Sequence, residues 1–84
     1  MAEYQVLYWW DIPAQIRVYV KGRPKSYPLP GRFQEEIDRV AMQEGLADSD
    51  AYLEQWSWTE KMSRQGDAEE VAEEVIRELS EARS

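Results

Sequence analysis

The chain has 84 residues, the length of a single small domain, and we expect one domain over residues 1–84. It contains no cysteine and no histidine, which excludes disulfides, thiolate nucleophiles, Cys/His metal sites and the commonest general base. Its net charge of −7 makes nucleic acids and anionic membranes unfavourable partners.

Residues 4–13, which read YQVLYWWDIP, form the most aromatic stretch of the chain. Strand alternation divides their side chains between two sides, with Tyr4, Val6, Tyr8 and Trp10 on one and Leu7 and Trp9 on the other. A strand that is apolar on both sides avoids water on both. The pattern therefore predicts the central strand of a sheet.

Residues 11–14, D-I-P-A, predict a break after this strand, because proline fixes its own φ and restricts the residue before it. Apolar and polar residues then alternate through residues 16–21, which is typical of a half-buried strand. This second strand follows closely enough to form an antiparallel hairpin with the first. A turn at residues 22–25 and the proline at Pro28 predict a short third strand near residues 25–29, at a sheet edge.

A first helix is predicted to begin near Pro30 or Gly31 and to end at Gly45, a residue that readily adopts the left-handed stop. Its apolar stripe comprises Phe33, Ile37, Val40 and Ala41. Residues 48–50, D-S-D, predict a cap for a short helical turn at residues 51–53.

Residues 54–62 allow two interpretations. In a helix Leu53, Trp56 and Glu60 align, but Trp58 points elsewhere. In a strand Trp56 and Trp58 share one face, and the run W-S-W-T favours β-structure. We prefer the strand.

The last helix has the clearest pattern. Asp67 with Glu70 resembles a capping box, and apolar residues follow helical spacing from Ala68 to Ala82. The predicted order is therefore β-β-β-α-β-α. This is an α+β fold, in which a small antiparallel or mixed sheet of three or four strands carries two helices packed on one face.

Two helices on one face leave the other face of the sheet without a cover. The side chains that we expect at an exposed interface there are Leu7, Trp9, Tyr19, Tyr27 and Trp58. Packing in the core is the main alternative for the tryptophans. The four bases within residues 17–25 fit a solvated hairpin face, and they also fit a site for a phosphate or an acidic partner.

Motifs of catalysis are missing from the sequence. It contains no phosphate-cradling glycine loop, no nucleophile elbow and no metal-ligand spacing, so we predict no enzyme and name no catalytic, cofactor or metal residue. No apolar run approaches the ~18 residues of a membrane span, and the N-terminus lacks a signal pattern. We therefore expect a cytoplasmic protein.

Two segments carry a resemblance to a known family, Y-W-W-D-I-P-A-Q-I-R-V and L-P-G-R-F-Q-E-E-I-D-R-V-A-M. Together with S-D-A-Y-L-E-Q-W-S-W and D-A-E-E-V-A-E-E-V, they make residues 4–82 similar to the bacterial "virulence factor" small domain, which also occurs in proteins of the conserved virulence factor C type. The resemblance implies a bacterial, intracellular accessory domain and assigns no catalytic residue or cofactor. It also implies company with one-carbon and corrinoid methyl-transfer genes.

The function expected from these observations is a non-enzymatic interaction or accessory domain, which binds a protein partner or forms a homodimer. The alternative is a small-molecule-binding module with an aromatic pocket, linked through the resemblance to one-carbon or corrinoid methyl transfer.

Overall fold

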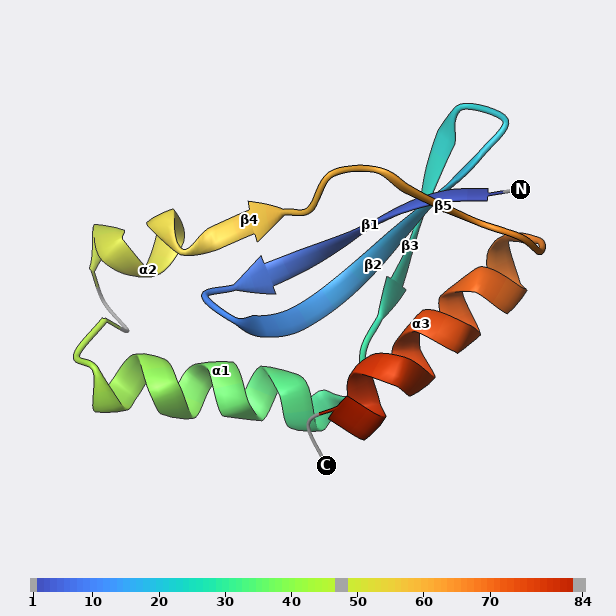
Figure 1. Ribbon diagram of the computed structural model, residues 1–84. Coiled ribbons are helices and arrows are strands. Elements are labelled where there is room, and N and C mark those ends of the chain that lie inside the picture. The colour runs from blue at the N-terminus through green and yellow to red at the C-terminus, as the bar shows by residue number, and fades with distance from the viewer. Residues whose placement is uncertain (1, 47–48, 83–84) are drawn as a thin grey trace.

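The structure is a computed structural model that describes residues 2–46 and 49–82. Its elements follow the chain in this order: β1 (Ala2–Trp9), β2 (Ile12–Val20), β3 (Arg23–Pro28), α1 (Gly31–Gln43), α2 (Asp50–Glu54), β4 (Trp56–Trp58), β5 (Met62–Arg64) and α3 (Ala68–Ala82). Figure 1 shows one sheet with the two long helices, α1 and α3, below it. The predicted α+β class is confirmed.

The sheet is antiparallel throughout, in the order β3-β2-β1-β4, and β5 also pairs with β1. β4 pairs with the end of β1 and β5 with its beginning, so two short strands share one edge. The preference for a strand in residues 54–62 is confirmed for β4. β5 was not predicted, and it raises the expected three or four strands to five among the described residues.

An irregularity in the pairing of β1 with β2 changes which side chains are buried. Leu7 pairs with Gln15 and Tyr8 pairs with Pro13, which leaves Ala14 as an extra residue on β2. Trp9, which pairs with Ile12 beyond this bulge, is fully buried with 0% exposure, and its ring packs against Tyr52. The expectation that Trp9 lies on an exposed face is therefore wrong.

The bulge also explains why the predicted break at residues 11–14 is misplaced. Pro13 is a buried residue of β2, where a bulge tolerates the missing N–H. The turn comes earlier, at Trp10 and Asp11. Trp10 has a φ of 59° and is 52% exposed, so it does not continue the buried side of β1.

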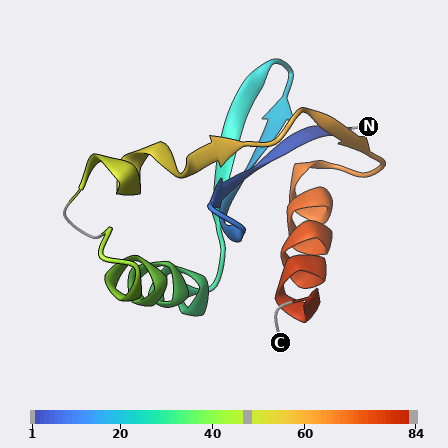
Figure 2. The same cartoon turned by 60° about the vertical axis from the view of Figure 1, so that its left-hand side comes forward.

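The core lies between the sheet and the two long helices. β1 and β2 contribute Tyr4, Val6, Ile12, Ile16 and Val18, α1 contributes Phe33, Ile37 and Ala41, and α3 contributes Val71, Ala72 and Val75. The apolar stripes predicted for both helices are thus the faces that they bury. Figure 2 shows α1 and α3 on the same side of the sheet in a second view.

The ends of the helices also match the sequence pattern. Gly45 has a φ of 70° directly after α1, and the backbone N–H of Glu70 donates to Asp67 Oδ1 at 2.9 Å at the start of α3. Ser49 is the N-cap of α2 and makes no side-chain capping hydrogen bond. Asp48, expected to contribute to that cap, lies outside the described residues.

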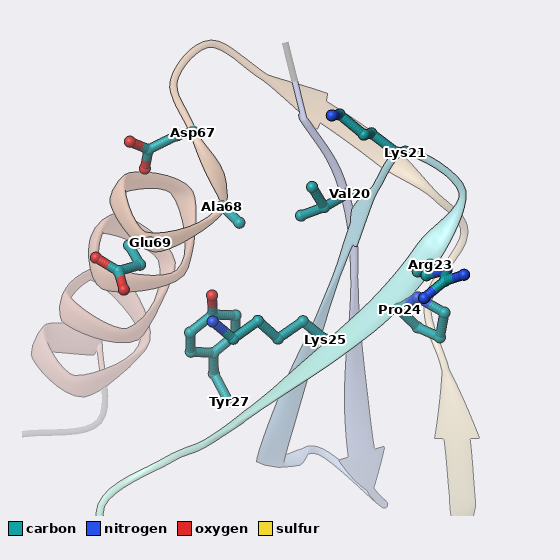
Figure 3. Close-up of a pocket in the computed structure, with 9 residues that line it drawn as sticks. All are labelled: Val20, Lys21, Arg23, Pro24, Lys25, Tyr27, Asp67, Ala68 and Glu69. Atoms are coloured by element: carbon teal, nitrogen blue, oxygen red, sulfur yellow. The ribbon is translucent and has the colours of Figure 1, made fainter.

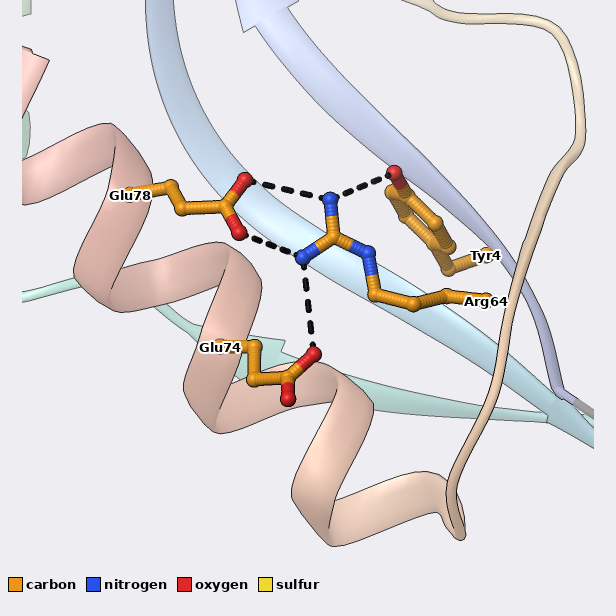
Figure 4. Close-up of polar contacts among 4 residues, drawn as sticks. All are labelled: Tyr4, Arg64, Glu74 and Glu78. Atoms are coloured by element: carbon orange, nitrogen blue, oxygen red, sulfur yellow. Dashed lines mark hydrogen bonds and ion pairs between the residues drawn. The ribbon is translucent and has the colours of Figure 1, made fainter.

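Arg64 ties β5 to α3 (Figure 4). Its guanidinium donates to both carboxylate oxygens of Glu78, at 2.6 and 3.1 Å, and to the hydroxyl of Tyr4 at 3.4 Å. Glu74 lies 3.6 Å away. The bidentate pair raises the pKa of Arg64 and lowers the pKa of Glu78. Because it joins two secondary elements, we assign this cluster a structural role.

Candidate functional site

The face of the sheet opposite α1 and α3 carries no helix of the described chain (Figures 1 and 2). We call it the open face. Cross-strand pairs bring its side chains together, because Gln5 lies opposite Arg17 and Leu7 lies opposite both Gln15 and Trp58. Gln5, Leu7, Arg17 and Trp58 are all half-buried. They therefore cover one another in part while remaining accessible.

Aromatic rings and cations alternate across this face. The guanidinium carbon of Arg17 lies 3.9 Å from the ring centre of Trp58 and 5.7 Å from that of Tyr19. The ammonium of Lys61 lies 4.1 Å from the centre of the same Tyr19 ring. These distances are those of cation–π contacts, which hold long basic side chains flat against rings. We call the four residues, Trp58, Arg17, Tyr19 and Lys61, the cation–aromatic ladder.

Gln5 fixes the geometry of the ladder. Its Oε1 accepts hydrogen bonds from the hydroxyl of Tyr19 at 2.6 Å and from Arg17 at 3.2 Å. Its Nε2 donates to the carbonyl oxygen of Thr59 at 2.9 Å. Thr59 is itself fixed, since its Oγ1 accepts from the backbone N–H of Val6 at 3.0 Å. The amide therefore links three strand segments and restrains the side chains on either side of it.

The two cations of the ladder lack acidic partners within the described chain. No carboxylate of residues 2–46 and 49–82 lies within 4 Å of Arg17 or Lys61. Glu3 is the cross-strand neighbour of Tyr19 and lies on the same face, but its carboxylate is not within 4 Å of either cation. In addition, Arg17 Nε is buried without an acceptor. Although the chain has 17 acidic and only 10 basic residues, Arg17 and Lys61 give this face positive charge.

The structure separates the five side chains that the sequence placed at an interface. Leu7, Tyr19 and Trp58 do lie together on the open face. Tyr27 pairs with Ile16, whose side chain belongs to the core, and so lies on the helix side. Trp9 is buried. The interface prediction is thus reduced to three of its members, and its role stays a prediction.

Three important residues of the site were not named from the sequence as interface residues: Gln5, Arg17 and Lys61. Arg17 and Gln5 had a usable signal, because alternation puts them on the same side as Tyr19 and Leu7 respectively. Lys61 had none, since it lies in the connection between β4 and β5.

The remaining tryptophans pack against one another at the end of β1. The rings of Trp9 and Tyr52 pack at a tilt, with their centres 5.4 Å apart. Tyr52 and Trp56 form a T-shaped pair, with ring centres 6.1 Å apart. Trp9 Nε1 also donates to the backbone carbonyl of Tyr52 at 2.9 Å. These rings attach α2 to β1. Trp9 is therefore a core residue at this end of β1.

No helix in the described part of the chain is long and apolar enough to cross a membrane.

Comparison with known proteins gives one match. No curated protein and no solved structure matches the chain. The sequence model of the family described as "Virulence factor" matches residues 7–83. That match runs from the middle of β1 to beyond the end of α3, so it includes the ladder and both long helices. The chain therefore belongs to the virulence factor family.

Proposed function

We propose that this chain is a non-enzymatic protein-interaction domain that acts as an accessory subunit in the bacterial cytoplasm, and that its contact surface is the open face. The observation that carries the proposal is the ladder. Cations held flat against rings, with no carboxylate of residues 2–46 and 49–82 within 4 Å, form a preorganised surface that gains Coulomb energy when a carboxylate arrives. The aromatic rings supply the apolar area that anchors most interfaces.

The face is a better contact surface than the β3 edge of the sheet. At that edge, the backbone N–H of Leu29 donates inward to Ala14, so the N–H groups of alternate residues back along β3 also point inward. Pro24 and Pro28 occupy positions whose N–H would point outward. Only Ser26 then offers an outward N–H along β3. Adding a strand there is unfavourable.

The chemistry of the face favours an acidic partner over a second copy of the chain. In a two-fold dimer through the open face, two identical surfaces face each other, so the positive charge that Arg17 and Lys61 give one surface meets the same charge on the other. Such like-charge contacts disfavour association. A different protein that presents carboxylates between apolar side chains satisfies both the cations and the rings.

The proposal is tested by affinity capture from the native bacterium. The baits include two double variants that have the same net charge as each other. The double variant Arg17→Gln, Lys61→Gln removes both cations of the ladder. The control Arg39→Gln, Arg77→Gln removes two exposed cations from α1 and α3. We expect the first variant to capture at least about tenfold less partner, which corresponds to about 1.4 kcal/mol of binding free energy. The control should capture as much as the wild type.

Light scattering on the purified chain separates the two kinds of partner. We expect a monomer of 9.9 kDa at physiological salt. If the wild type is a dimer and the ladder variant is a monomer, then the partner of the open face is a second copy of the chain, and the proposed acidic partner is wrong. Equal capture by both double variants, or a monomer that captures nothing, would contradict the proposed contact surface.

A further inference from the structure

A cleft of about 930 Å³ opens on the helix side of the sheet, between the β2–β3 hairpin and the first turn of α3 (Figure 3). Its lining includes Val20, Pro24, Lys25 and Tyr27 from the hairpin and Ala68 and Glu69 from α3. This volume lies within the range of about 300–1,000 Å³ that is usual for small-molecule sites. The cleft is separate from the open face, on the other side of the sheet.

Each of the two walls of the cleft is fixed by its own local structure. On the hairpin side, Lys21 and Gly22 form a two-residue turn in which both have positive φ, 51° and 80°, as in the turns that match strand twist. On the helix side, Asp67 Oδ1 accepts from the N–H of Glu70 and fixes the start of α3. The cleft is therefore bounded by ordered elements.

The hydroxyl of Tyr27 has no hydrogen-bond partner although its oxygen is shielded from water. Figure 3 shows the Tyr27 ring lying between β3 and α3, with the Lys25 side chain beside it. The Lys25 ammonium lies 5.5 Å from the centre of that ring. An unpaired buried hydroxyl destabilises the folded chain, so an acceptor that reaches Tyr27 from the cleft it lines would stabilise the bound state.

Charge is distributed unequally across the cleft. Lys21, Arg23 and Lys25 line the hairpin side, while Asp67 and Glu69 line the helix side. Within the described residues no carboxylate lies within 4 Å of Lys25. A bound anion is therefore favoured beside Lys25 and Tyr27 and disfavoured beside α3. Val20, Pro24 and Ala68 offer apolar surface between these ends.

From this arrangement we propose that the cleft binds a small organic anion with an apolar body. Its anionic group accepts hydrogen bonds from the Tyr27 hydroxyl and the Lys25 ammonium, and its apolar body covers Val20 and Ala68. This second site does not depend on the open face. The domain then has a small-molecule site on one side of its sheet and a protein contact surface on the other.

The test uses three probes and the amide resonances of the isotope-labelled chain. The probes are 2-naphthoate, its neutral analogue 2-naphthylmethanol, and inorganic phosphate. We expect 2-naphthoate to give saturable shifts at Val20 to Arg23, at Lys25, and at Ala68 and Glu69. The neutral analogue should bind at least about tenfold more weakly, and phosphate alone should not saturate in the same range.

Two variants locate the binding groups. Lys25→Gln should weaken 2-naphthoate at least about fivefold, and Tyr27→Phe at least about threefold, without lowering the thermal midpoint, since the hydroxyl has no partner to lose. Arg39→Gln, on α1, should leave the affinity unchanged. The proposal is overturned if the shifts fail to saturate, map to the open face, or are equal for the charged and neutral probes. Equal affinity of Tyr27→Phe, Lys25→Gln and the wild type also overturns it.

Discussion

Two adjacent tryptophans in this chain have opposite environments. Trp9 is 0% exposed and donates a hydrogen bond to Tyr52, whereas Trp10 is 52% exposed and occupies the left-handed region. That region is unfavourable for an L-residue with a large side chain by about 1–2 kcal/mol. The contact of Trp10 with the ring of Trp9, at 5.9 Å between ring centres, offsets part of this strain.

Substitution of the two residues should therefore have unequal effects on stability. We expect Trp9→Ala to lower the free energy of unfolding by about 3–5 kcal/mol, because it opens a cavity in the core. Trp10→Asn should change it by no more than about 1 kcal/mol, since asparagine adopts the left-handed region more readily. Urea denaturation of both variants measures this, and comparable losses would refute the assignment of Trp10 to the surface.

The Arg64–Glu78 pair makes a prediction for pH. The hydrogen bond from Arg64 lowers the pKa of Glu78 below its ordinary value of 4.5. Because the folded-state pKa is depressed, the pair's contribution is present above the unfolded pKa and disappears as the pH falls through the folded pKa. Both side chains are partly exposed, so the contribution is about 1 kcal/mol or less.

Glu78→Gln should accordingly be less stable than the wild type at pH 7, and the two should converge in acid, below the folded pKa of Glu78. Denaturation midpoints at a series of pH values test this. Glu74→Gln is the matched control, because its carboxylate lies 3.6 Å from Arg64 and accepts no hydrogen bond from the guanidinium. A constant difference between Glu78→Gln and the wild type at all pH values would exclude this linkage.

At the scale of elements, β3 illustrates how proline protects an edge. Pro24 and Pro28 remove the outward N–H groups on either side of Ser26. The variant Pro24→Thr, Pro28→Thr restores both donors, and we expect it to self-associate at concentrations where the wild type is monomeric. Light scattering across a concentration series measures this. Pro30→Ala, outside the strand, is the control, and a monomeric double variant would show that the prolines have another role.

The elements differ in how far the sequence predicts them. α1 and α3 each bury one continuous stripe, so a period of 3.6 locates them and their ends, including the Asp67 cap and Gly45. The burial pattern of β1 alternates only as far as Leu7, and the bulge that follows is on β2 and depends on the pairing of the two strands. β5 has three residues, and its strand structure comes from β1, which is distant in sequence. No local pattern carries that information.

The whole molecule is thin, with Cα extents of 41 × 26 × 16 Å, because the sheet has helices on one side only. This two-layer form was expected from the sequence, and with it a second face of the sheet that the two long helices do not cover. Leu7, Tyr19 and Trp58 follow from alternation. The contacts of Lys61 and the hydrogen bonds of Gln5 depend on how β4 and its connection cross the sheet, which only the tertiary structure shows.

The charge of the open face predicts that partner binding depends on salt. If the ladder meets carboxylates, raising the salt from about 0.05 to about 0.5 M should slow association and weaken binding, since screening shortens the Debye length from about 14 to about 4 Å. Binding measured by interferometry across this range tests the charge complementarity. Affinity that stays constant would indicate an apolar contact without the cations.

The most direct measurement of the central claim is site-specific photocrosslinking in the living cell. Ser26 is exposed and lies opposite Arg17, so a benzoylphenylalanine at this position reports on the open face without changing the ladder. Glu73, exposed on α3, provides the matched position on the helix side. We expect a discrete protein adduct from position 26 that disappears when Arg17→Gln and Lys61→Gln are added, and none from position 73. An adduct from position 73 alone, or one from position 26 that survives loss of both cations, would contradict the open face as the contact surface.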